Sequence, residues 1–167
     1  DLTKMLADNP DLAAPDFSAV LGELRAWASE LGFSQIAVSD IDLRDAEAGL
    51  LAWLEAGFHG SMDYMAAHGL KRARPAELVP GTLRVITARM DYLPRRTADG
   101  WQAIEWQRLA TPAAANVSIY ARGRDYHKVL RARLQRLADR IAQAVGPFGH
   151  RVFSDSAPVL EVELASR

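Results

Sequence analysis

One carboxylate, Asp155, lies at a position typical of a catalytic acid. It belongs to the segment FSDSAPVLE, residues 153–161, which we interpret as a strand that runs into a helix. Proteins of the α/β class place functional groups at the carboxyl ends of strands. If the Asp155 carboxyl faces a pocket, burial favours its neutral form and makes it a proton donor. The alternative is structural, because Asp155 or Ser156 could cap the following helix, with Pro158 near its first turn.

A second candidate is the basic segment SIYARGRDYHK at 118–128. Gly123 precedes a predicted helix there and is flanked by arginines, an arrangement that suits an anion such as phosphate. The alternative is that Asp125 caps the helix, Tyr126 enters the core and the arginines are solvated. The segment alone does not choose between the two.

Several other chemistries have no support in these residues. The chain holds no cysteine, which excludes disulfides, thiolate metal sites and cysteine nucleophiles within it. Its histidines show no close metal-ligand spacing, so we assign no metal site. These histidines are His59, His68, His127 and His150. Neither a phosphate-binding G-x-x-x-x-G-K-[ST] loop nor a dinucleotide-binding G-x-G-x-x-G motif is present.

The composition is that of one compact domain over residues 1–167, with 49% hydrophobic residues and a net charge of −1. The near-neutral charge gives no reason to infer a nucleic-acid or membrane partner from the whole chain. Residues 1–16 lack the features of a secretory signal, and no run of 18 apolar residues occurs. We therefore expect a soluble, cytosolic domain. Both ends look cut from a longer chain, so we expect further segments in the parent protein.

Apolar spacing predicts the elements that must hold these candidates. Helices are expected at 16–32, 42–58, 62–69, near 75–79, at 124–146 and at 157–166, with Asp16 capping the first and Gly32 ending it. Strands are expected at 33–40, 83–93 and 150–155. Val85 lies opposite the apolar face of the second strand, which suggests burial of both faces, as in a central strand.

Residues 94–116 lose all periodicity and are predicted to form a long functional or variable loop. Trp101 and Trp106 within it are expected to pin the loop down or to meet a partner. The order of elements predicts a mixed α/β or α+β fold, with helices packed on a small mixed sheet.

Four segments together resemble the epoxyqueuosine reductase family. They are LAWLEAGFHGSMDYMAAH at 51–68, KRARPAELVPGTLRVI at 71–86, YARGRDYHKVLRARL at 120–134 and FSDSAPVLE at 153–161. Each motif alone is weak, but the set occurs in the order and spacing of that family. The resemblance spans most of 31–165, with 94–116 outside it.

The resemblance implies an oxidoreductase that reduces epoxyqueuosine to queuosine at the wobble position of transfer RNA, the last step of queuosine formation. It implies a base-off cobalamin, two four-iron–four-sulfur clusters, an electron donor and a parent protein that is monomeric. The clusters would lie in a ferredoxin-like domain outside this chain, which is consistent with the missing cysteines. The chain would then be the incomplete amino-terminal, cobalamin-binding part, inactive alone.

In the matching motif, the family's proton donor corresponds to Asp155, which would also lie beside the corrin. Two further corrin-contacting positions fall on Arg72 and Ser118. The chain departs from the family at Ile119 and Val162, where relatives often carry arginine. These changes put anion contacts at 119 and 162 in doubt and leave the other positions untouched.

The transfer-RNA substrate gives the basic segment a specific role. We expect its cations to contact phosphates around the anticodon loop. The sequence of the RNA would be recognised through bases that are splayed out of the stack. The cations are Arg122, Arg124, Lys128 and Arg131. Two alternatives remain open: a corrinoid- or RNA-binding domain without turnover, and a relative of corrinoid reductive dehalogenases. Two cysteine clusters beyond Arg167 would identify an electron-transfer enzyme.

Overall fold

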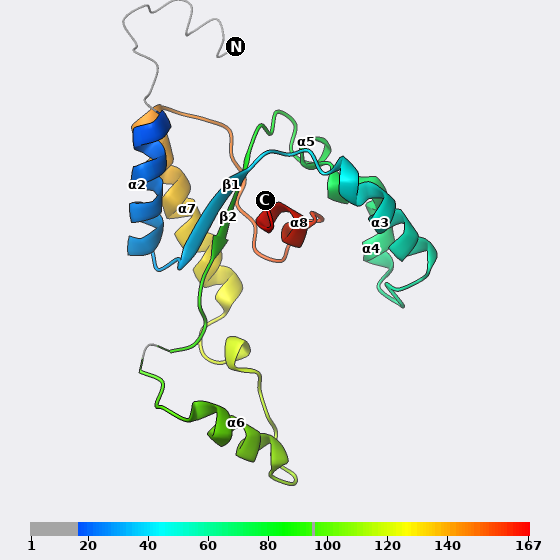
Figure 1. The fold of residues 1–167 in the computed structure, drawn as a ribbon, viewed down its shortest axis with the longest axis vertical. Helices are drawn as coiled ribbons and strands as arrows, with labels where there is room; N and C mark the ends of the chain where they lie inside the picture. Colours follow the sequence, from blue (N-terminus) through cyan, green and yellow to red (C-terminus); the bar gives the residue numbers. More distant parts are fainter. Residues whose placement is uncertain (1–16, 95) are drawn as a thin grey trace, which may run out of the picture.

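The computed structural model describes residues 17–94 and 96–167, and Figure 1 shows their arrangement. Over these residues the chain forms seven α-helices, two short 3₁₀ helices and one two-stranded sheet, which confirms the mixed α/β class. The α-helices are α2 (Phe17–Glu30), α3 (Arg44–Glu55), α4 (Asp63–Ala67), α5 (Pro75–Leu78), α6 (Trp101–Ala110), α7 (Tyr126–Val145) and α8 (Glu161–Ala165). The strands are β1 (Gln35–Ser39) and β2 (Val85–Arg89), and the 3₁₀ helices are η1 (Gly69–Ala73) and η2 (Ile119–Ala121).

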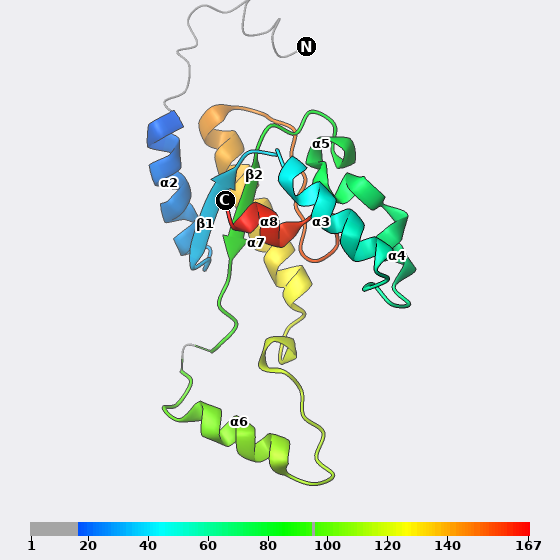
Figure 2. The same cartoon turned by 45° about the vertical axis from the view of Figure 1, so that its right-hand side comes forward.

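The two strands are antiparallel, with Ile36 opposite Ala88. Side chains alternate between the faces of a strand, so Ile36 and Ala88 point to one face and Val85 to the other. Helices α2 and α7 cover the first face, and α8 lies against the second (Figure 2). Burial on both faces of β2 is therefore confirmed. The expected central position is wrong within the described residues, because β2 pairs only with β1.

The first core joins α2, α7 and the sheet. Its buried members are Leu24, Ala28, Phe33 and Leu137. The end of α2 is fixed as the sequence predicted: Gly32 adopts a left-handed φ of 85°, its N–H donates to the Ser29 carbonyl, and the Phe33 N–H donates to the Ala28 carbonyl. This pair of hydrogen bonds is a Schellman motif, and it turns the chain directly into β1. The expected cap, Asp16, lies outside the described residues.

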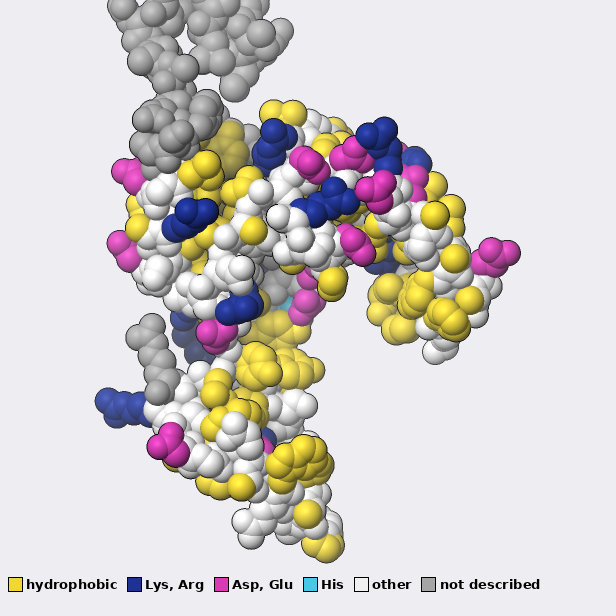
Figure 3. Space-filling view, viewed as in Figure 1, with side chains coloured by type: hydrophobic (Ala, Val, Ile, Leu, Met, Phe, Trp, Pro, Cys, Tyr) yellow, Lys and Arg dark blue, Asp and Glu magenta, His cyan; other side chains and the backbone are white. Residues whose placement is uncertain are grey.

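The second core holds α8 against the lobe formed by α3 and η1. Its buried members are Leu43, Leu50, Ala73 and Leu164. Within this lobe, the Arg74 guanidinium links the end of η1 to α3 through two hydrogen bonds to the Glu47 carboxylate, at 2.7 and 3.1 Å. Pro75 occupies the first turn of α5, as predicted. At the far end of the lobe the side chains of Phe58 and Tyr64 are exposed, and Figure 3 shows hydrophobic atoms gathered there.

Residues 94–116 do not form the predicted loop throughout, because α6 occupies the middle of this segment. Figures 1 and 2 show α6 on an arm that projects away from the sheet. Trp106 does not pin the arm, since it is 70% exposed, whereas Trp101 is half-buried. The arm is held instead by polar contacts, of which the pair between Glu105 and Arg122 is the main one.

The predicted strand at 150–155 is also wrong, since these residues run without a ladder partner in the described part of the chain. A strand needs a neighbour for its main-chain hydrogen bonds, and the sheet ends at two strands. The last helix begins only at Glu161, so 157–160 lie outside it. No helix in 17–94 or 96–167 combines the length and the apolar composition needed to cross a membrane.

Candidate functional site

Asp155 lies on the connection between α7 and α8 with a backbone conformation that is unusual for its residue type. Its φ is 53°, in the left-handed region that non-glycine residues occupy at a cost. The carboxylate does not cap α8, which starts six residues later with Leu160 at its cap position and no side-chain cap bond. The structural alternative from the sequence, a cap of the last helix, is therefore wrong.

The Asp155 carboxylate is held by the first residue of α7. The phenol of Tyr126 donates a hydrogen bond to Asp155 Oδ2 at 2.6 Å, although the two residues are 29 positions apart in sequence. This short bond fixes Oδ2, and Oδ1 accepts no hydrogen bond from another described residue. The acid predicted from sequence thus has a positioning group that the sequence did not identify.

His127 lies between two carboxylates. Its Nδ1 is 3.2 Å from Asp125 Oδ1, and its Nε2 is 3.8 Å from Asp155 Oδ2. The ring stacks on Tyr126 with centroids 4.0 Å apart. Asp125 also caps α7 by accepting from the His127 main-chain N–H at 3.0 Å, as in the structural alternative for this segment. The motif RDYHK held the signal for this cluster, but its contact with Asp155 required the tertiary fold.

Two pKa shifts report the electrostatics of this cluster. The hydrogen bond to the Asp155 carboxylate, with burial second, raises the pKa of Tyr126 to about 12, because ionising the phenol would lose the bond and set two negative charges together. Burial raises the pKa of Glu161, and the negative charge of Asp155 adds to that effect. The negative charge of Asp155 therefore acts on Glu161, whose pKa lies above its ordinary value.

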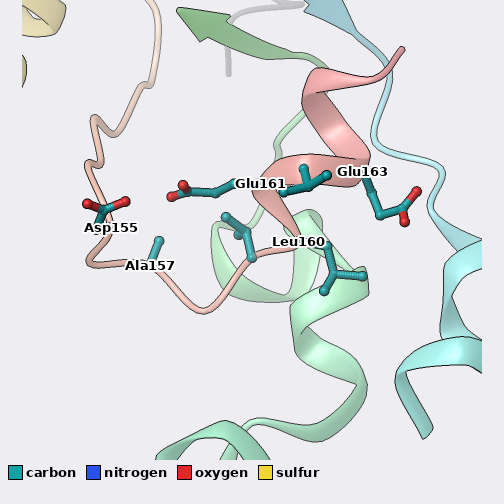
Figure 4. Close-up of a pocket in the computed structure, with 7 residues that line it drawn as sticks. Asp155, Ala157, Leu160, Glu161 and Glu163 are labelled. Atoms are coloured by element: carbon teal, nitrogen blue, oxygen red, sulfur yellow. The ribbon is translucent and has the colours of Figure 1, made fainter. Parts of the chain in front are cut away.

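Asp155 also borders a pocket of about 440 Å³ (Figure 4). Its lining is Asp155, Ala157, Val159, Leu160, Glu161, Val162 and Glu163. The pocket is open, and Val162 on it is 81% exposed. Figure 4 shows the Glu161 carboxylate extending toward Asp155, with the small apolar side chains on the same side. The pocket thus combines four apolar side chains with three carboxylates, those of Asp155, Glu161 and Glu163, and its apolar part could receive one face of a broad, planar ring.

Arg72 lies inside the protein, with 7% exposure. Its guanidinium donates to the carbonyls of Tyr64 and Met65, both at 2.9 Å, in the short helix α4. Its own carbonyl accepts from the Leu160 N–H at 3.1 Å. The predicted corrin-contacting arginine therefore links α4 to the start of α8, the helix that lines the pocket.

The predicted residues of the basic segment fall into two groups. Arg122 forms a two-bond ion pair with Glu105 and also donates to the Val117 carbonyl at 2.8 Å. Ser118 caps η2, and its carbonyl accepts from the Ala121 N–H at 2.9 Å. The remaining cations are Arg124, Lys128 and Arg131; all three are exposed, and none forms an ion pair with another described residue.

An aromatic row connects these parts. Tyr120 packs edge-on against Tyr126 at 5.8 Å between centroids and against Tyr92 at 6.4 Å. The row leads from the Asp155 cluster toward the arm. No group of three or more histidine, aspartate and glutamate side chains within 17–94 and 96–167 is arranged to hold a metal ion.

Comparisons with known proteins agree on one family. The family model described as "Epoxyqueuosine reductase QueG, DUF1730" matches residues 72–156, which are just over half of the 167 residues and include Arg72, Ser118 and Asp155. No solved structure was found to match the chain.

Curated relatives carry the same description. The chain is 71% identical over 150 residues to "Epoxyqueuosine reductase" of Alicycliphilus denitrificans, which covers 90% of this chain and 42% of the relative. It is 65% identical to the protein of that name from Burkholderia pseudomallei, over 86% of this chain and 38% of the relative. It is 59% identical to that of Pseudomonas aeruginosa, over 97% of this chain and 43% of the relative. The chain thus spans about two fifths of these relatives, and it belongs to the epoxyqueuosine reductase QueG family.

Proposed function

We propose that this chain is the acid-bearing part of an oxidoreductase that reduces epoxyqueuosine to queuosine on transfer RNA, with Asp155 as the proton donor. The single observation that supports the role of Asp155 is its geometry. Its carboxylate, anchored by Tyr126 at 2.6 Å on a residue with a left-handed backbone, borders an open pocket that is apolar in part. Strain of this kind is often retained at functional sites.

The chemistry requires a placed acid. Converting an epoxide to an alkene removes its oxygen as water, which consumes two electrons and two protons. The oxygen leaves more easily once it is protonated, so an acid beside it lowers the barrier.

A base-off cobalamin, the cofactor that the family resemblance implies, would supply the reducing chemistry for the epoxide. Its ring would lie on the pocket surface made by Ala157, Val159 and Val162, with Asp155 at its edge. Ser118 would contact the corrin from η2, and Arg72 would support the site through its bond to Leu160. Because the chain has no cysteine, ligands of two four-iron–four-sulfur clusters would lie outside it, and the 167 residues would not turn over alone.

Transfer RNA would meet the free cations beside this site. Lys128 and Arg131 are three residues apart on α7 and share a face, and Arg124 lies two residues before the helix. Phosphates are attracted to such cations regardless of sequence. Arg122 would contact RNA only after leaving Glu105, so we assign it a smaller part in binding.

The test is Asp155→Asn in the full-length, cobalamin-loaded enzyme. We expect alkene formation to fall by about 100-fold or more, the usual loss when a general acid is removed, with the cobalamin absorption spectrum unchanged. Asn also tolerates the left-handed backbone, so the loop keeps its shape. Normal turnover with normal cobalamin content would show that Asp155 is not the donor.

A further inference from the structure

The proposed reaction needs more protons than the Asp155 carboxyl group alone can supply. Each turnover needs two protons, and a carboxylic acid carries one. Either a second acid acts, or Asp155 is protonated again before the product leaves. The inference below rests on the proposed function, because it concerns how that same acid is recharged.

His127 is the group nearest to Asp155 that can do this. Its Nε2 lies 3.8 Å from Asp155 Oδ2, a gap that a small side-chain rotation closes to hydrogen-bonding distance. Its Nδ1 faces Asp125 Oδ1 at 3.2 Å, and this carboxylate keeps a proton on Nδ1 and aims Nε2 at Asp155. The imidazole is also half-exposed to solvent, so it can collect protons from water or buffer.

Tyr126 has a different part in the same cluster. Its phenol donates to Asp155 Oδ2 at 2.6 Å, and its ring stacks on the imidazole at 4.0 Å. With a pKa of about 12 the phenol keeps its proton at neutral pH and remains a donor throughout. It therefore positions the carboxylate without exchanging protons with it.

We propose that His127 returns a proton to Asp155 between the two proton transfers of one turnover, and that Tyr126 is the positioning residue for this exchange. After Asp155 has given its proton to the substrate oxygen, the imidazolium N–H of His127 passes its proton to the Asp155 carboxylate. The products of this step are neutral imidazole and a carboxylic acid. The imidazole then takes a proton from solvent, and the electrons come from the low-potential donor of the proposed reaction.

The surroundings of His127 define the expected pH behaviour. Asp125 and Tyr126 face it from its own helix end and Asp155 from the segment after α7, and Tyr120 lies on η2 beyond the Tyr126 ring. Glu161, the first residue of α8, acts on this cluster through Asp155. At low pH, hydronium and buffer acids can protonate Asp155 directly. At higher pH such donors are scarce, and the imidazole route should dominate.

The experiment compares single-turnover alkene formation by the full-length, prereduced enzyme carrying His127→Gln with that of the unaltered enzyme from pH 6 to pH 8.5. We expect a loss of about 10- to 100-fold at the alkaline end, within the lower range for proton-transfer groups, and at most about threefold at pH 6. His68→Gln is the matched control, because His68 is exposed and belongs to a different part of the fold. It should leave the profile unchanged.

A second variant, His127→Gly, tests the same step without relying on one substitution. Added imidazole should restore at least part of its alkaline rate, which a merely structural defect would not allow. The proposal requires both results: a loss that is equal at every pH, no loss at all, or no rescue by imidazole would each overturn it. Inactivity of Asp155→Asn together with a normal His127→Gln enzyme would overturn this inference alone. Normal turnover by Asp155→Asn would instead overturn the proposed function.

Discussion

Glu105 on α6 and Arg122 after η2 face each other as a two-bond ion pair, with Nη1–Oε1 at 2.9 Å and Nη2–Oε2 at 2.5 Å. The pair closes the base of the arm, because Arg122 also donates to the Val117 carbonyl. Arg108, one turn further along α6, adds a bond to Glu105 at 2.8 Å. One carboxylate therefore joins α6 to the carboxyl-terminal end of the projecting segment.

Glu105→Gln should loosen the arm. Replacing the charge weakens both arginine contacts, so we expect tryptic cleavage after Arg108 at pH 8 to accelerate by about two- to fivefold, the range typical of a partly exposed ion pair. Glu23→Gln on α2 is the control, since that carboxylate is exposed and forms no ion pair with a described residue. Equal cleavage rates in all three proteins would show that the pair does not hold the arm.

The same pair should make the arm sensitive to acid. Arg122 lowers the pKa of Glu105 below its ordinary value of 4.5. A carboxyl with a lowered folded-state pKa contributes stability above its unfolded pKa and loses it as the pH falls through the folded value. Hydrogen exchange in residues 99–122 should therefore quicken below about pH 4.5 in the unaltered protein and not in Glu105→Gln. A pH response that is identical in both would contradict this assignment.

Removing the Asp155 charge should lower the pKa of Tyr126 from about 12 toward the ordinary phenol value of 10.0, because the hydrogen bond and the negative charge both oppose ionisation. Asp155→Asn in the full-length protein, with ¹³C-labelled tyrosine followed by NMR from pH 8 to pH 12.5, measures this. A group whose folded pKa is raised contributes stability below its unfolded pKa and loses it as the pH rises. The contribution of Tyr126 to the free energy of unfolding should thus disappear as the pH rises from about 10 to about 12.

Asp125→Asn is the internal comparison for that titration. The charge of Asp125 raises the pKa of Tyr126 less than the Asp155 carboxylate does, so its replacement should change that pKa much less. A Tyr126 midpoint that stays near 12 in Asp155→Asn would mean that the 2.6 Å bond is not maintained in solution.

Arg72→Met should open the lobe around α4. The change leaves the part-buried carbonyls of Tyr64 and Met65 without their side-chain donor, and each such loss costs at most about 1–3 kcal/mol. We expect the free energy of local opening of residues 63–73, measured by native-state hydrogen exchange, to fall by about 2–4 kcal/mol. Arg72→Lys should recover part of this, because one ammonium can reach one carbonyl. Arg84→Met, at an exposed arginine, should have little effect.

Two glycines only ten residues apart should respond to alanine with opposite signs. Gly32 has φ of 85°, and a Cβ there would lie 2.4 Å from Arg133 Nη1, so Gly32→Ala should destabilise the α2–β1 connection by about 1–2 kcal/mol. Gly22 lies within α2 with open space around it, and Gly22→Ala should stabilise the helix by about 0.5–1 kcal/mol. Thermal melts of the two variants provide the measurement, and a shift in the same direction would refute the argument.

Much of the fold could be predicted because its signals are local. The Gly32 termination of α2, the Asp125 cap of α7 and the Pro75 start of α5 each depend on one residue type with a known conformational preference. Helix α6 was missed because its apolar residues do not follow one stripe, and Trp106 and Leu109 remain exposed. Its sequence, WQAIEWQRLA, is nevertheless rich in strong helix formers, and that propensity could have identified it.

The site was predictable only in part for the same reason. A motif identifies Asp155. The strand expected before it rests on the β propensity of Val152 and Phe153. In the described chain no neighbouring strand pairs with these residues, so the strand does not form. The partnership with Tyr126 joins positions 29 apart, and no local pattern encodes it. Arg72 is likewise identified by its motif, but its hydrogen bonds to the carbonyls of α4 depend on tertiary packing and cannot be predicted from the motif.

The two-stranded sheet has a practical consequence for anyone who prepares these 167 residues alone. Along β1 and β2, one edge of each strand keeps main-chain donors and acceptors without a ladder partner among the described residues. Open edges can template pairing between molecules, and a net charge of only −1 supplies little colloidal repulsion against it. Concentrated solutions of the isolated chain should therefore self-associate through their backbones, and a lysine placed on an edge would be a direct way to keep them monodisperse.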